Sequence, residues 1–451
     1  MLYLSQLIGC PLRDRVGNQV ARIQDLVVLL PPPAAAAEIA TRYAAYPRLH
    51  GLVARGGQRA AGFFVPRASL AAIGPEGARL ATPDVFLETF ARRPNELLLL
   101  ADLADHPVID CRKAVVRRVN DVLLGREDEI AAAPPVPPEM PGSGAAVYAP
   151  GDLCLLGIDA GWPGLLRRLN LLGGATGLLR AFGRVLVPQL VPWPDLALTG
   201  PLHTHRRSAL GRLHPAEIAR LTDALSYHEA AGLIAGLDDE TAADVLEEVD
   251  AERATDIMEQ LPDARAADII EEMGPDDASD LLGDLPEERA ADLLAEMEPE
   301  AAEDVRELLR YPDDSAGGMM TTSFVTCPRG YTVRQVVDLL RAELDKPDLV
   351  YYIYVVDGPE DTHLAGVVTL RKLLIAGSAD PVEAIMRTDF EHVGPFDNPR
   401  HVARVMAEYK LLALPVLDET GRLLGIITVD DAIEVLLPSG WQRKLNRIFT
   451  S

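Results

Sequence analysis

Six aspartates recur at one constant spacing in the middle of the chain: Asp244, Asp256, Asp268, Asp280, Asp292 and Asp304. Each is followed by an apolar pair, or in the last unit by Val305 alone, and then by a further apolar residue. Each unit also has a Pro, Asp or Glu start suited to a helix N-terminus, with room for about two helical turns. Two weaker units, from His214 and Ser226, extend the array to eight. Helices this short cannot bury an apolar face alone, so the repeat predicts a stacked superhelix.

The whole net negative charge of the chain lies within this array. The whole chain carries a net charge of −25, and residues 214–309 contain 30 Asp and Glu against 5 Arg and no Lys. The remaining 355 residues therefore sum to zero. Such an acidic segment repels nucleic acid and attracts cations or basic partners, which argues against nucleic acid as a partner. The repeated aspartates also have a simpler explanation, because an acid near a helix N-terminus complements the helix dipole.

The remaining composition is typical of a globular protein. A length of 451 residues corresponds to about three domains, and 48% hydrophobic with 25% charged residues indicates folded chain. No run reaches the roughly 18 consecutive apolar residues of a membrane-spanning helix, and the N-terminus lacks the pattern of a secretory signal. The four cysteines, Cys10, Cys111, Cys154 and Cys327, lie far apart. We therefore expect neither a disulfide framework nor a zinc site, and a reducing cytoplasm.

Residues 1–125 contain an internal duplication with an offset of 96 residues. The segments 4–7, 11–14 and 20–27 recur as 100–103, 107–110 and 116–123. Because one offset relates every segment, the similarity indicates a true repeat. Short β-branched runs between Gly, Asn and Asp turns predict small β units at residues 1–90 and 97–160.

The first β unit resembles a PRC-barrel, a small β-barrel, and the second is a weaker match. PRC-barrels generally bind partners, so the resemblance implies an adaptor role, and a purely structural role is the alternative. Residues 161–212 follow as a linking segment. Within it, residues 164–187 are Leu-rich with Arg on one side, which predicts an amphipathic helix broken at Gly173-Gly174. Such a helix packs on the neighbouring barrel or lies on a membrane surface.

From Tyr311 onward, strands alternate with helices in two copies of one βαββα unit. The expected strands and helices are 351–357, 364–369 and 370–376 in the first copy, and 414–418, 423–428 and 429–437 in the second. Both copies end a β hairpin in Gly-Φ-Φ-Thr, at Gly366 to Thr369 and at Gly425 to Thr428. These features resemble a pair of CBS domains, at residues 313–378 and 379–437.

The order of these segments resembles the cytosolic region of MgtE-type magnesium transporters. An acidic superhelix at 213–312, a Tyr-Pro and Ser-Ala-Gly-Gly junction at 311–321, and two CBS units follow one another as in that family. In the family, membrane helices follow through an acidic connecting helix, whereas a basic, aromatic tail occupies residues 438–451 here. We therefore expect that this chain is not itself a pore. The expected fold class is multidomain α+β: PRC-like β units, an all-α superhelix of 12-residue repeats and a tandem CBS pair.

The CBS resemblance implies a site for ATP, ADP or AMP between the two units. A carboxylate in a Thr-x-x-Asp motif accepts hydrogen bonds from the ribose hydroxyls. Thr428 and Asp431 keep this motif in the second unit, whereas Lys372 replaces the Asp in the first. The same resemblance places Tyr354 in the lining of the site and Arg371 near the phosphates. The alternative is that Thr428 and Asp431 only cap the helix that follows.

The MgtE resemblance implies weak Mg²⁺ sites between the superhelix and the CBS pair. Mg²⁺ prefers hard oxygen ligands and keeps part of its water shell, so clustered carboxylates suit it. Asp276, Asp277 and Asp280 resemble the Asp-Asp-x-x-Asp stretch of the family. The CBS side departs from the family, because Lys410 stands where an Asp is common and the connecting-helix acids are absent. A solvated acidic face without an ordered site is the alternative.

These features predict a regulatory protein and no enzyme, because the sequence contains neither a nucleophile elbow nor a phosphate-binding Gly loop. The leading hypothesis is a cytoplasmic sensor of Mg²⁺ or adenine nucleotide, peripheral to the inner face of the membrane, that acts in trans on a membrane transporter. The alternative is a scaffold whose PRC and CBS domains contact other proteins without sensing a ligand. The resemblance also implies a homodimer through residues 320–437. The tail offers basic and aromatic residues to a membrane, to the transporter or to the chain's own superhelix.

Overall fold

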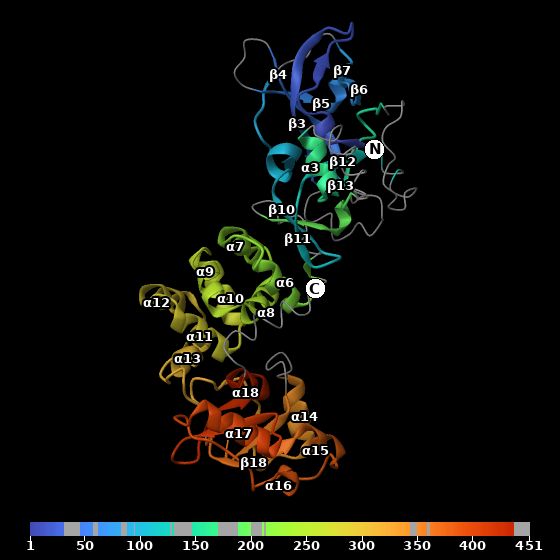
Figure 1. Cartoon of the computed structure of the whole chain (residues 1–451). Coiled ribbons are helices and arrows are strands. Elements are labelled where there is room, and N and C mark those ends of the chain that lie inside the picture. The colour runs from blue at the N-terminus through green and yellow to red at the C-terminus, as the bar shows by residue number, and fades with distance from the viewer. Residues whose placement is uncertain are drawn as a thin grey trace, which may run out of the picture. The chain divides into compact units, whose positions relative to one another are not determined.

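The computed structural model of the chain contains two compact units, Met1–Leu237 and Asp238–Ser451 (Figure 1). The structure describes residues 1–30, 46–56, 62–82, 88–93, 95–126, 129, 147–169, 188–199, 210–211, 213–342, 350–358 and 361–436. The tail at 438–451 and most of the expected amphipathic helix at 164–187 lie outside these residues. No helix in this described part is both long and apolar enough to cross a membrane.

The first unit contains a near-barrel sheet of 12 strands. Its strands are β1 (Leu2–Tyr3), β2 (Pro11–Arg13), β3 (Gln19–Leu29), β4 (Arg48–Arg55), β5 (Phe63–Pro66), β6 (Leu70–Gly74), β7 (Gly77–Leu80), β8 (Glu88–Thr89), β9 (Glu96–Leu98), β12 (Asp121–Gly125), β13 (Cys154–Asp159) and β14 (Leu190–Pro192). The main path runs β1-β12-β13-β4-β3-β2-β7-β6. A separate three-stranded sheet has the order β11 (Val115–Arg118), β10 (Pro107–Asp110) and β15 (Leu196–Leu198).

The two expected β units share the large sheet. Strand β12 of the second sequence copy pairs with β1 of the first, and β9 pairs with β3. Residues 1–90 and 97–160 therefore do not form two separate sheets. The physical reason is burial, because strands this short expose one apolar face unless a larger sheet covers it.

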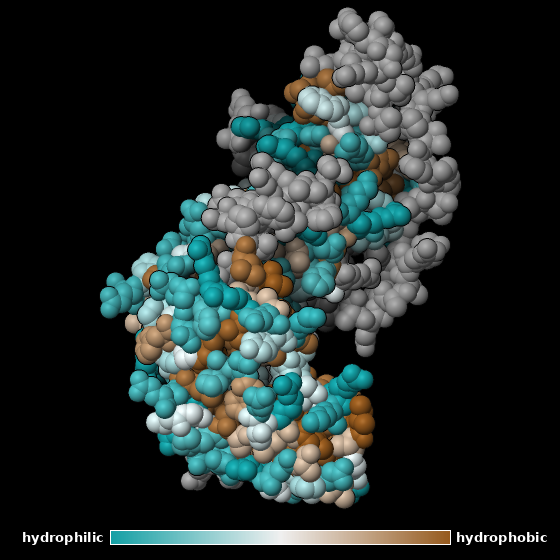
Figure 2. Space-filling view, turned by 60° about the horizontal axis from the view of Figure 1, so that its bottom comes forward, coloured by the Kyte–Doolittle hydropathy of each residue, from teal (hydrophilic) through white to brown (hydrophobic). Residues whose placement is uncertain are grey.

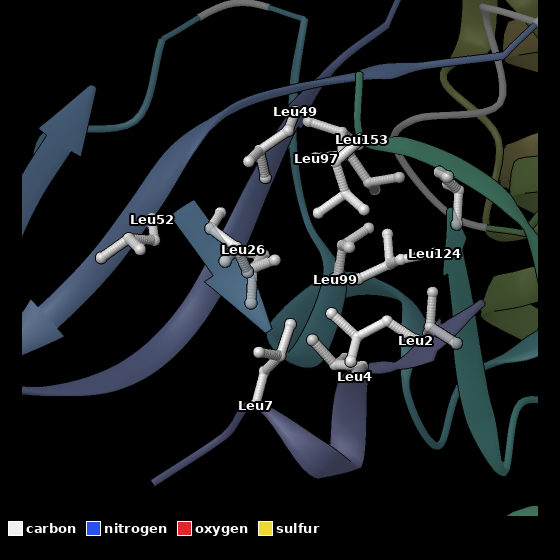
Figure 3. Close-up of a cluster of buried hydrophobic side chains, with 14 of the residues drawn as sticks. Leu2, Leu4, Leu7, Leu26, Leu49, Leu52, Leu97, Leu99, Leu124 and Leu153 are labelled. Atoms are coloured by element: carbon white, nitrogen blue, oxygen red, sulfur yellow. The ribbon is translucent and has the colours of Figure 1, made fainter. Parts of the chain in front are cut away.

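One leucine-rich core lies inside this sheet (Figure 3). The strands contribute Leu2, Leu26, Leu49, Leu52, Leu97 and Leu124, and Leu153 precedes β13. Two short helical turns, η1 (Leu4–Gln6) and η3 (Leu99–Leu103), contribute Leu4 and Leu99. A fully buried leucine contributes about 1.5–3 kcal/mol by leaving water. The two halves of the duplication therefore fold around a common core.

The duplicated halves exchange equivalent hydrogen bonds. Asp25 on β3 accepts the backbone N–H groups of Leu100 and Ala101, at 2.8 and 3.0 Å, in the helical turn η3 of the second copy. Its equivalent in the second copy, Asp121, accepts the backbone N–H and hydroxyl of Ser5, at 3.1 and 2.6 Å, in the helical turn η1 of the first copy. Each copy thus caps the helical turn of the other, as expected for buried carboxylates near backbone donors.

Asp121 also belongs to a buried charge network with α3 (Trp162–Arg168). Arg167 donates to Asp121 at 3.1 Å and to Asp159 at 2.7 Å, and its guanidinium lies 3.3 Å from the ring centre of Tyr3. Both carboxylates are fully enclosed, so the arginine supplies the positive charge that their burial requires. The remaining short helices of the sheet region are η2 (Arg67–Ser69) and η4 (Trp193–Asp195).

Eight evenly spaced helices follow, one for each unit of the sequence repeat: α6 (Pro215–Thr222), α7 (Tyr227–Ala235), α8 (Asp239–Glu247), α9 (Ala251–Met258), α10 (Asp263–Glu272), α11 (Pro275–Asp284), α12 (Glu287–Glu296) and α13 (Pro299–Leu308). The first two belong to the first unit and the other six to the second. In the second unit, α8 packs on α10 and α10 on α12, while α9 packs on α11 and α11 on α13. Alternate helices therefore stack in two rows.

Ion pairs join each helix of one row, α8, α10 and α12, to the next. Arg265 on α10 pairs with Asp239 on α8, and Arg289 on α12 pairs with Asp263 on α10. Arg289 also donates to the carbonyl of Leu261 at 2.9 Å. The apolar pair of each unit points inward, as Val245-Leu246 and Ile269-Ile270 are buried. Burial of this pair supplies the stacking energy that a short helix lacks alone.

Two α/β units complete the second unit of the chain. The first contains β16 (Thr326–Pro328), α14 (Val333–Ala342), β17 (Tyr352–Val356), β18 (Leu364–Thr369), α15 (Leu370–Ile375) and α16 (Val382–Ile385), with the strands in the order β16-β17-β18. The second contains α17 (Pro399–Tyr409), β19 (Ala413–Leu417), β20 (Leu423–Thr428) and α18 (Val429–Leu436). Figure 1 shows α17 and α18 in red beside the orange elements of the first α/β unit, and Figure 2 shows the hydropathy of the surface.

Candidate functional site

The helical array is firmly joined to the second α/β unit. Leu308 at the end of α13 packs in one buried cluster with Met320, Met406 and Ile427. The Ser-Ala-Gly-Gly junction binds the loop before α17, where the backbone N–H of Ala316 donates to the Asp397 carbonyl at 2.8 Å. This junction holds the array against the strands that carry the Thr-x-x-Asp motif.

Glycine is required at one position of the junction. The backbone N–H of Gly317 donates to the Pro395 carbonyl at 2.6 Å. A Cβ added at Gly317 would lie 2.6 Å from the Tyr311 ring and 3.0 Å from the Pro395 oxygen. Tyr311 also contacts Phe396, with ring centres 6.0 Å apart. The close approach of the two segments therefore depends on a missing side chain.

Carboxylates from α11 and α18 converge next to this junction. Asp276 and Asp277 lie in the first turn of α11, and the Thr321 hydroxyl donates to Asp276. Thr321 is paired with Ile426 on β20, the strand that leads into α18. Asp430 and Asp431 lie in the first turn of α18. Two helix N-termini from distant parts of the sequence thus bring four carboxylates together.

Burial at this convergence raises the pKa values of Asp276, Asp277 and Asp431. Burial raises the pKa of Asp276, and the charge of Asp430 adds to the rise. Burial by surrounding protein also raises the pKa of Asp277 to about 9, with further increases from Asp276, Glu247, Asp431 and Asp280 in that order. The residue Asp277 remains accessible to solvent, so water and ions screen part of this effect. The group therefore holds protons, or binds cations, more strongly than separate carboxylates would.

Asp277 departs from the pattern of its own repeat. Arginine occupies the equivalent position in the two preceding units and in the following one, as Arg253, Arg265 and Arg289. Two of these, Arg265 and Arg289, form the ion pairs between alternate helices. In α11 the same position carries a negative charge beside other negative charges. Stacking of the helices does not explain this aspartate, because the stacking pattern uses arginine there.

The structure brings together only part of the expected magnesium set. Asp276 and Asp277 lie at the convergence, and Asp280, one turn later on α11, is exposed and acts electrostatically on Asp277. No three His, Cys, Asp or Glu side chains of the described ranges stand in a metal-coordinating arrangement. Sequence reasoning missed Asp430, Glu247 and Thr321. The only available signal was that Asp430 and Asp431 are adjacent at a helix start.

Thr428 and Asp431 form a helix cap. Asp431 accepts the Thr428 hydroxyl and, at 3.3 Å, the Thr428 backbone N–H. Burial raises the pKa of Asp431 to about 7, and the charges of Asp276 and Asp430 add to the rise, whereas the Thr428 hydroxyl opposes it. In the first α/β unit, Thr369 accepts the Lys372 N–H at 3.2 Å instead. The carboxylate of Asp431 therefore has a structural partner and also faces the carboxylates of α11.

Tyr354 lies where the two α/β units meet. It is 1% exposed and packs with Ala413, Leu417 and Ile426 of the second unit. Ala413 is the register partner of Thr428, so the tyrosine and the Thr-x-x-Asp motif border the same strand pair. Among the described residues, the buried hydroxyls of Tyr354 and Thr322 have no hydrogen-bond partner. Buried hydroxyls usually have a hydrogen-bond partner, so the Tyr354 hydroxyl is an exception within this interface.

Arg371 and the two lysines lie outside this interface core. Arg371 is exposed on α15, with Lys372 beside it. Lys410 is also exposed and ends α17 in the left-handed conformation, with φ of 56°. Its backbone N–H donates to the Met406 carbonyl, which closes the helix. The Lys410 position therefore has a defined role in ending a helix.

Comparison with known protein families agrees with this arrangement. Residues 213–314 match the MgtE intracellular N domain, and residues 316–378 and 382–438 each match the CBS domain. Residues 213–438 thus combine an N domain of the MgtE type with a pair of CBS domains. Residues 213–438 are homologous to the cytosolic region of MgtE magnesium transporters.

Individual relatives show how far the similarity extends. The magnesium transporter MgtE of Thermus thermophilus is 44% identical over 133 residues, which is 30% of this chain and 29% of that protein. MgtE of Enterococcus faecalis is 40% identical over 135 residues, with the same shares. A solved structure of the cytosolic domain of the Mg²⁺ channel MgtE in complex with ATP is 36% identical, with a TM-score of 0.49, and covers 51% of this chain and 93% of that one. The chain therefore spans about 29% of the length of these curated relatives.

Proposed function

We propose that this protein is a regulatory sensor of divalent cations and adenine nucleotides that acts on a membrane transporter in trans. The observation that carries the proposal is the convergence of Asp276 and Asp277 with Asp430 and Asp431 at the junction. The homology to the cytosolic region of MgtE supports a role in transport regulation. In this proposal the protein is cytoplasmic, lies at the inner face of the membrane and catalyses no reaction.

Mg²⁺ is the cation that this chemistry favours. It prefers carboxylate oxygens and commonly keeps several of its waters, so it binds a site whose ligands are not fully arranged beforehand. Burial raises the pKa values of Asp277 and Asp431, and repulsion from neighbouring carboxylates adds to the rise. A hydrated ion between α11 and α18 would neutralise this repulsion. Asp280 would stay in the outer electrostatic environment. Cation binding would therefore tighten the contact between the helical array and the CBS pair, and the tightened contact is the signal.

Thermal melting of the full chain tests the cation proposal. Millimolar Mg²⁺ should raise the melting temperature well beyond a potassium salt of matched ionic strength, because ligand binding to the folded state stabilises it by mass action. Asp277→Asn should remove most of this difference. The matched control is Asp292→Asn, which removes an exposed carboxylate from α12. Equal shifts in Mg²⁺ and in potassium would mean that only screening occurs, and the cation proposal would be rejected.

The nucleotide part of the proposal rests on the interface around Tyr354. The unpartnered hydroxyl of Tyr354 offers a hydrogen bond beside the strand pair that carries the Thr-x-x-Asp motif. Thr322, whose hydroxyl is also unpartnered, follows Thr321, which pairs with Ile426 of the same strand pair. Asp431 would exchange its bond to Thr428 for the ribose hydroxyls, and Arg371 would approach the phosphates. Calorimetry with ATP, ADP and AMP should show binding, and Asp431→Ala should weaken it by about 1.5–3 kcal/mol. An absence of heat with all three nucleotides would refute this part alone.

We also propose a homodimer through residues 320–437. Exposed apolar side chains on α15 and α18 support it, because Leu374 and Ile375 are 74% and 75% exposed and Ile433 and Leu436 are 50% and 58% exposed. Contiguous exposed apolar residues mark protein interfaces. Light scattering of the full chain should give twice the monomer mass. The replacement of Leu374 and Ile375 by Glu should reduce that mass to the monomer value, and an unchanged mass would exclude this interface.

Action in trans requires a membrane partner. A pull-down from native membranes, with and without Mg²⁺, should recover a transporter in one of the two conditions only. Recovery that does not depend on Mg²⁺ or nucleotide would favour a scaffold instead of a sensor.

A further inference from the structure

The outward face of the sheet in the first unit carries a group of arginines. Strand pairing puts Arg22 of β3 directly opposite Arg55 of β4, and Arg13 of β2 beside Arg79 of β7. The neighbouring residues along these four strands point into the core and are buried: Leu12, Ala21, Ala54 and Ala78. Because side chains alternate along a strand, the four arginines share the outward face. We call these four residues the arginine face.

This arrangement is unfavourable for the sheet by itself. Like charges directly opposite each other destabilise a strand pair. Arg22 donates to the Gly9 carbonyl at 2.7 Å, and no ion pair joins a residue of the arginine face to a carboxylate within the described chain. The nearby Asp14 carboxylate accepts backbone N–H groups of its own turn. Four arginines arranged in this way indicate an external anionic partner.

Exposed aliphatic side chains lie next to the arginine face. Val16, at the tip of the hairpin between β2 and β3, is 87% exposed, and Val20 is 45% exposed. Arg15 precedes Val16 at the same tip and is also exposed. An apolar tip bordered by cations is suited to the boundary between lipid headgroups and acyl chains. A nucleic acid backbone would not bury these valines, because single strands are bound by stacking on aromatic rings.

The charge distribution along the chain favours the same face. Residues 1–213 contain 23 Lys and Arg against 18 Asp and Glu, whereas residues 214–309 carry the net charge of −25. An anionic surface would therefore attract residues 1–213 and repel residues 214–309. This difference would orient the chain on such a surface.

We propose that the arginine face docks on an anionic lipid surface, with Val16 entering the headgroup region. The planar guanidinium groups would bind lipid phosphates by paired hydrogen bonds, which offsets the repulsion between Arg22 and Arg55. This docking needs neither Mg²⁺ nor nucleotide. It goes beyond the sensing function, and it can fail or succeed independently of it.

Vesicle flotation of the full chain in EDTA tests this proposal. The chain should float with vesicles of phosphatidylcholine that contain about a third phosphatidylglycerol, and should not float with phosphatidylcholine alone. The double variant Arg55→Gln/Arg79→Gln should reduce binding about 30-fold, because each arginine near an anionic surface contributes about fivefold. The melting temperature of this variant should be unchanged or higher, because like-charge pairs are removed.

The sequence duplication supplies a matched control. Arg118 is the equivalent of Arg22 in the second copy and faces Pro107, as Arg22 faces Pro11. The double variant Arg117→Gln/Arg118→Gln removes the same charge and should retain vesicle binding. Equal loss in both double variants would show that only net charge matters, and the proposed face would be wrong.

A third variant separates lipid from other polyanions. Val16→Asp should weaken vesicle binding at least as much as the loss of one arginine, because it places a charge in the headgroup region. If wild type binds polyuridylic acid as tightly as vesicles, and Val16→Asp changes neither affinity, the arginine face is a nucleic-acid surface and the lipid proposal is overturned. Flotation with neutral vesicles would overturn it too.

Discussion

The replacement of Asp277 by arginine tests the carboxylate convergence most directly. Three other units of the repeat carry arginine at this position, so the helix accepts the side chain without strain. In α11 the new guanidinium would lie among Asp276, Glu247 and Asp431, which act electrostatically on Asp277. The variant should therefore replace a cation with a permanent positive charge.

The expected gain follows from the raised pKa of Asp277. A pKa of about 9 against the ordinary value of 3.8 shows that neighbouring carboxylates and burial oppose its ionisation. Full conversion of that shift would give several kcal/mol. Asp277 is accessible to solvent, however, so screening reduces the usable energy to about 1–2 kcal/mol. For a unit of this size we expect a rise in melting temperature of about 3–6 °C in EDTA.

Thermal melting in EDTA and in millimolar Mg²⁺ measures both parts of this prediction. Asp277→Arg should melt higher than wild type in EDTA and should gain little further stability from Mg²⁺. The control Glu300→Arg makes the same charge change in the first turn of α13. A lower melting temperature of Asp277→Arg in EDTA, or an undiminished response to Mg²⁺, would refute the reasoning.

Four further predictions follow from other parts of the structure. The pKa values of Asp277 and Asp431 are raised to about 9 and about 7, so the contribution of these groups to stability is present below pH 4 and is lost as pH rises toward 7–9. Stabilisation by Mg²⁺ should therefore be larger at pH 8 than at pH 5.5. Melting scans at equal ionic strength that show no difference between the two pH values would contradict this. Gly317→Ala should destabilise the second unit by about 1–3 kcal/mol in chemical unfolding, whereas Gly330→Ala, whose added Cβ meets no atom within 4 Å, should not. Asp121→Asn should cost about 2–3 kcal/mol because it removes one partner of Arg167 in a buried network, and equal stability of variant and wild type would contradict this. Burial raises the pKa of the equivalent Asp25 to about 6, so its stabilising contribution is present below pH 4 and is lost as pH rises through 6. Asp25→Asn should therefore lower the free energy of unfolding by no more than about 1 kcal/mol at pH 7. If Asp25→Asn is more destabilising than Asp121→Asn, the ion pair with Arg167 is not what makes the two positions differ.

Much of the local structure is determined by the sequence alone. The helix starts at Asp239, Asp263 and Glu287 lie where the period of the repeat places them, because each start combines a charge favoured by the helix dipole with an apolar pair that has to be buried. The strand pair ending in Thr428 lies within the range expected from its β-branched run. Both signals depend on neighbours within one or two turns of chain, so a sequence pattern contains them.

The arrangement of the site and of the sheet was decided by tertiary structure. The duplication predicts that Asp25 and Asp121 are equivalent, but not that each caps a helical turn of the other copy. The Asp-Asp stretch of α11 predicts a magnesium site, but not that Asp430 lies beside Asp276. The sequence of the Thr428 and Asp431 motif is compatible with a helix cap and with a nucleotide site, and both interpretations use the Asp431 carboxylate. Contacts between segments far apart in the sequence depend on where the packed elements place their ends. Burial at these contacts changes the charge and hydrogen bonding of side chains, although the sequence already gives their identity.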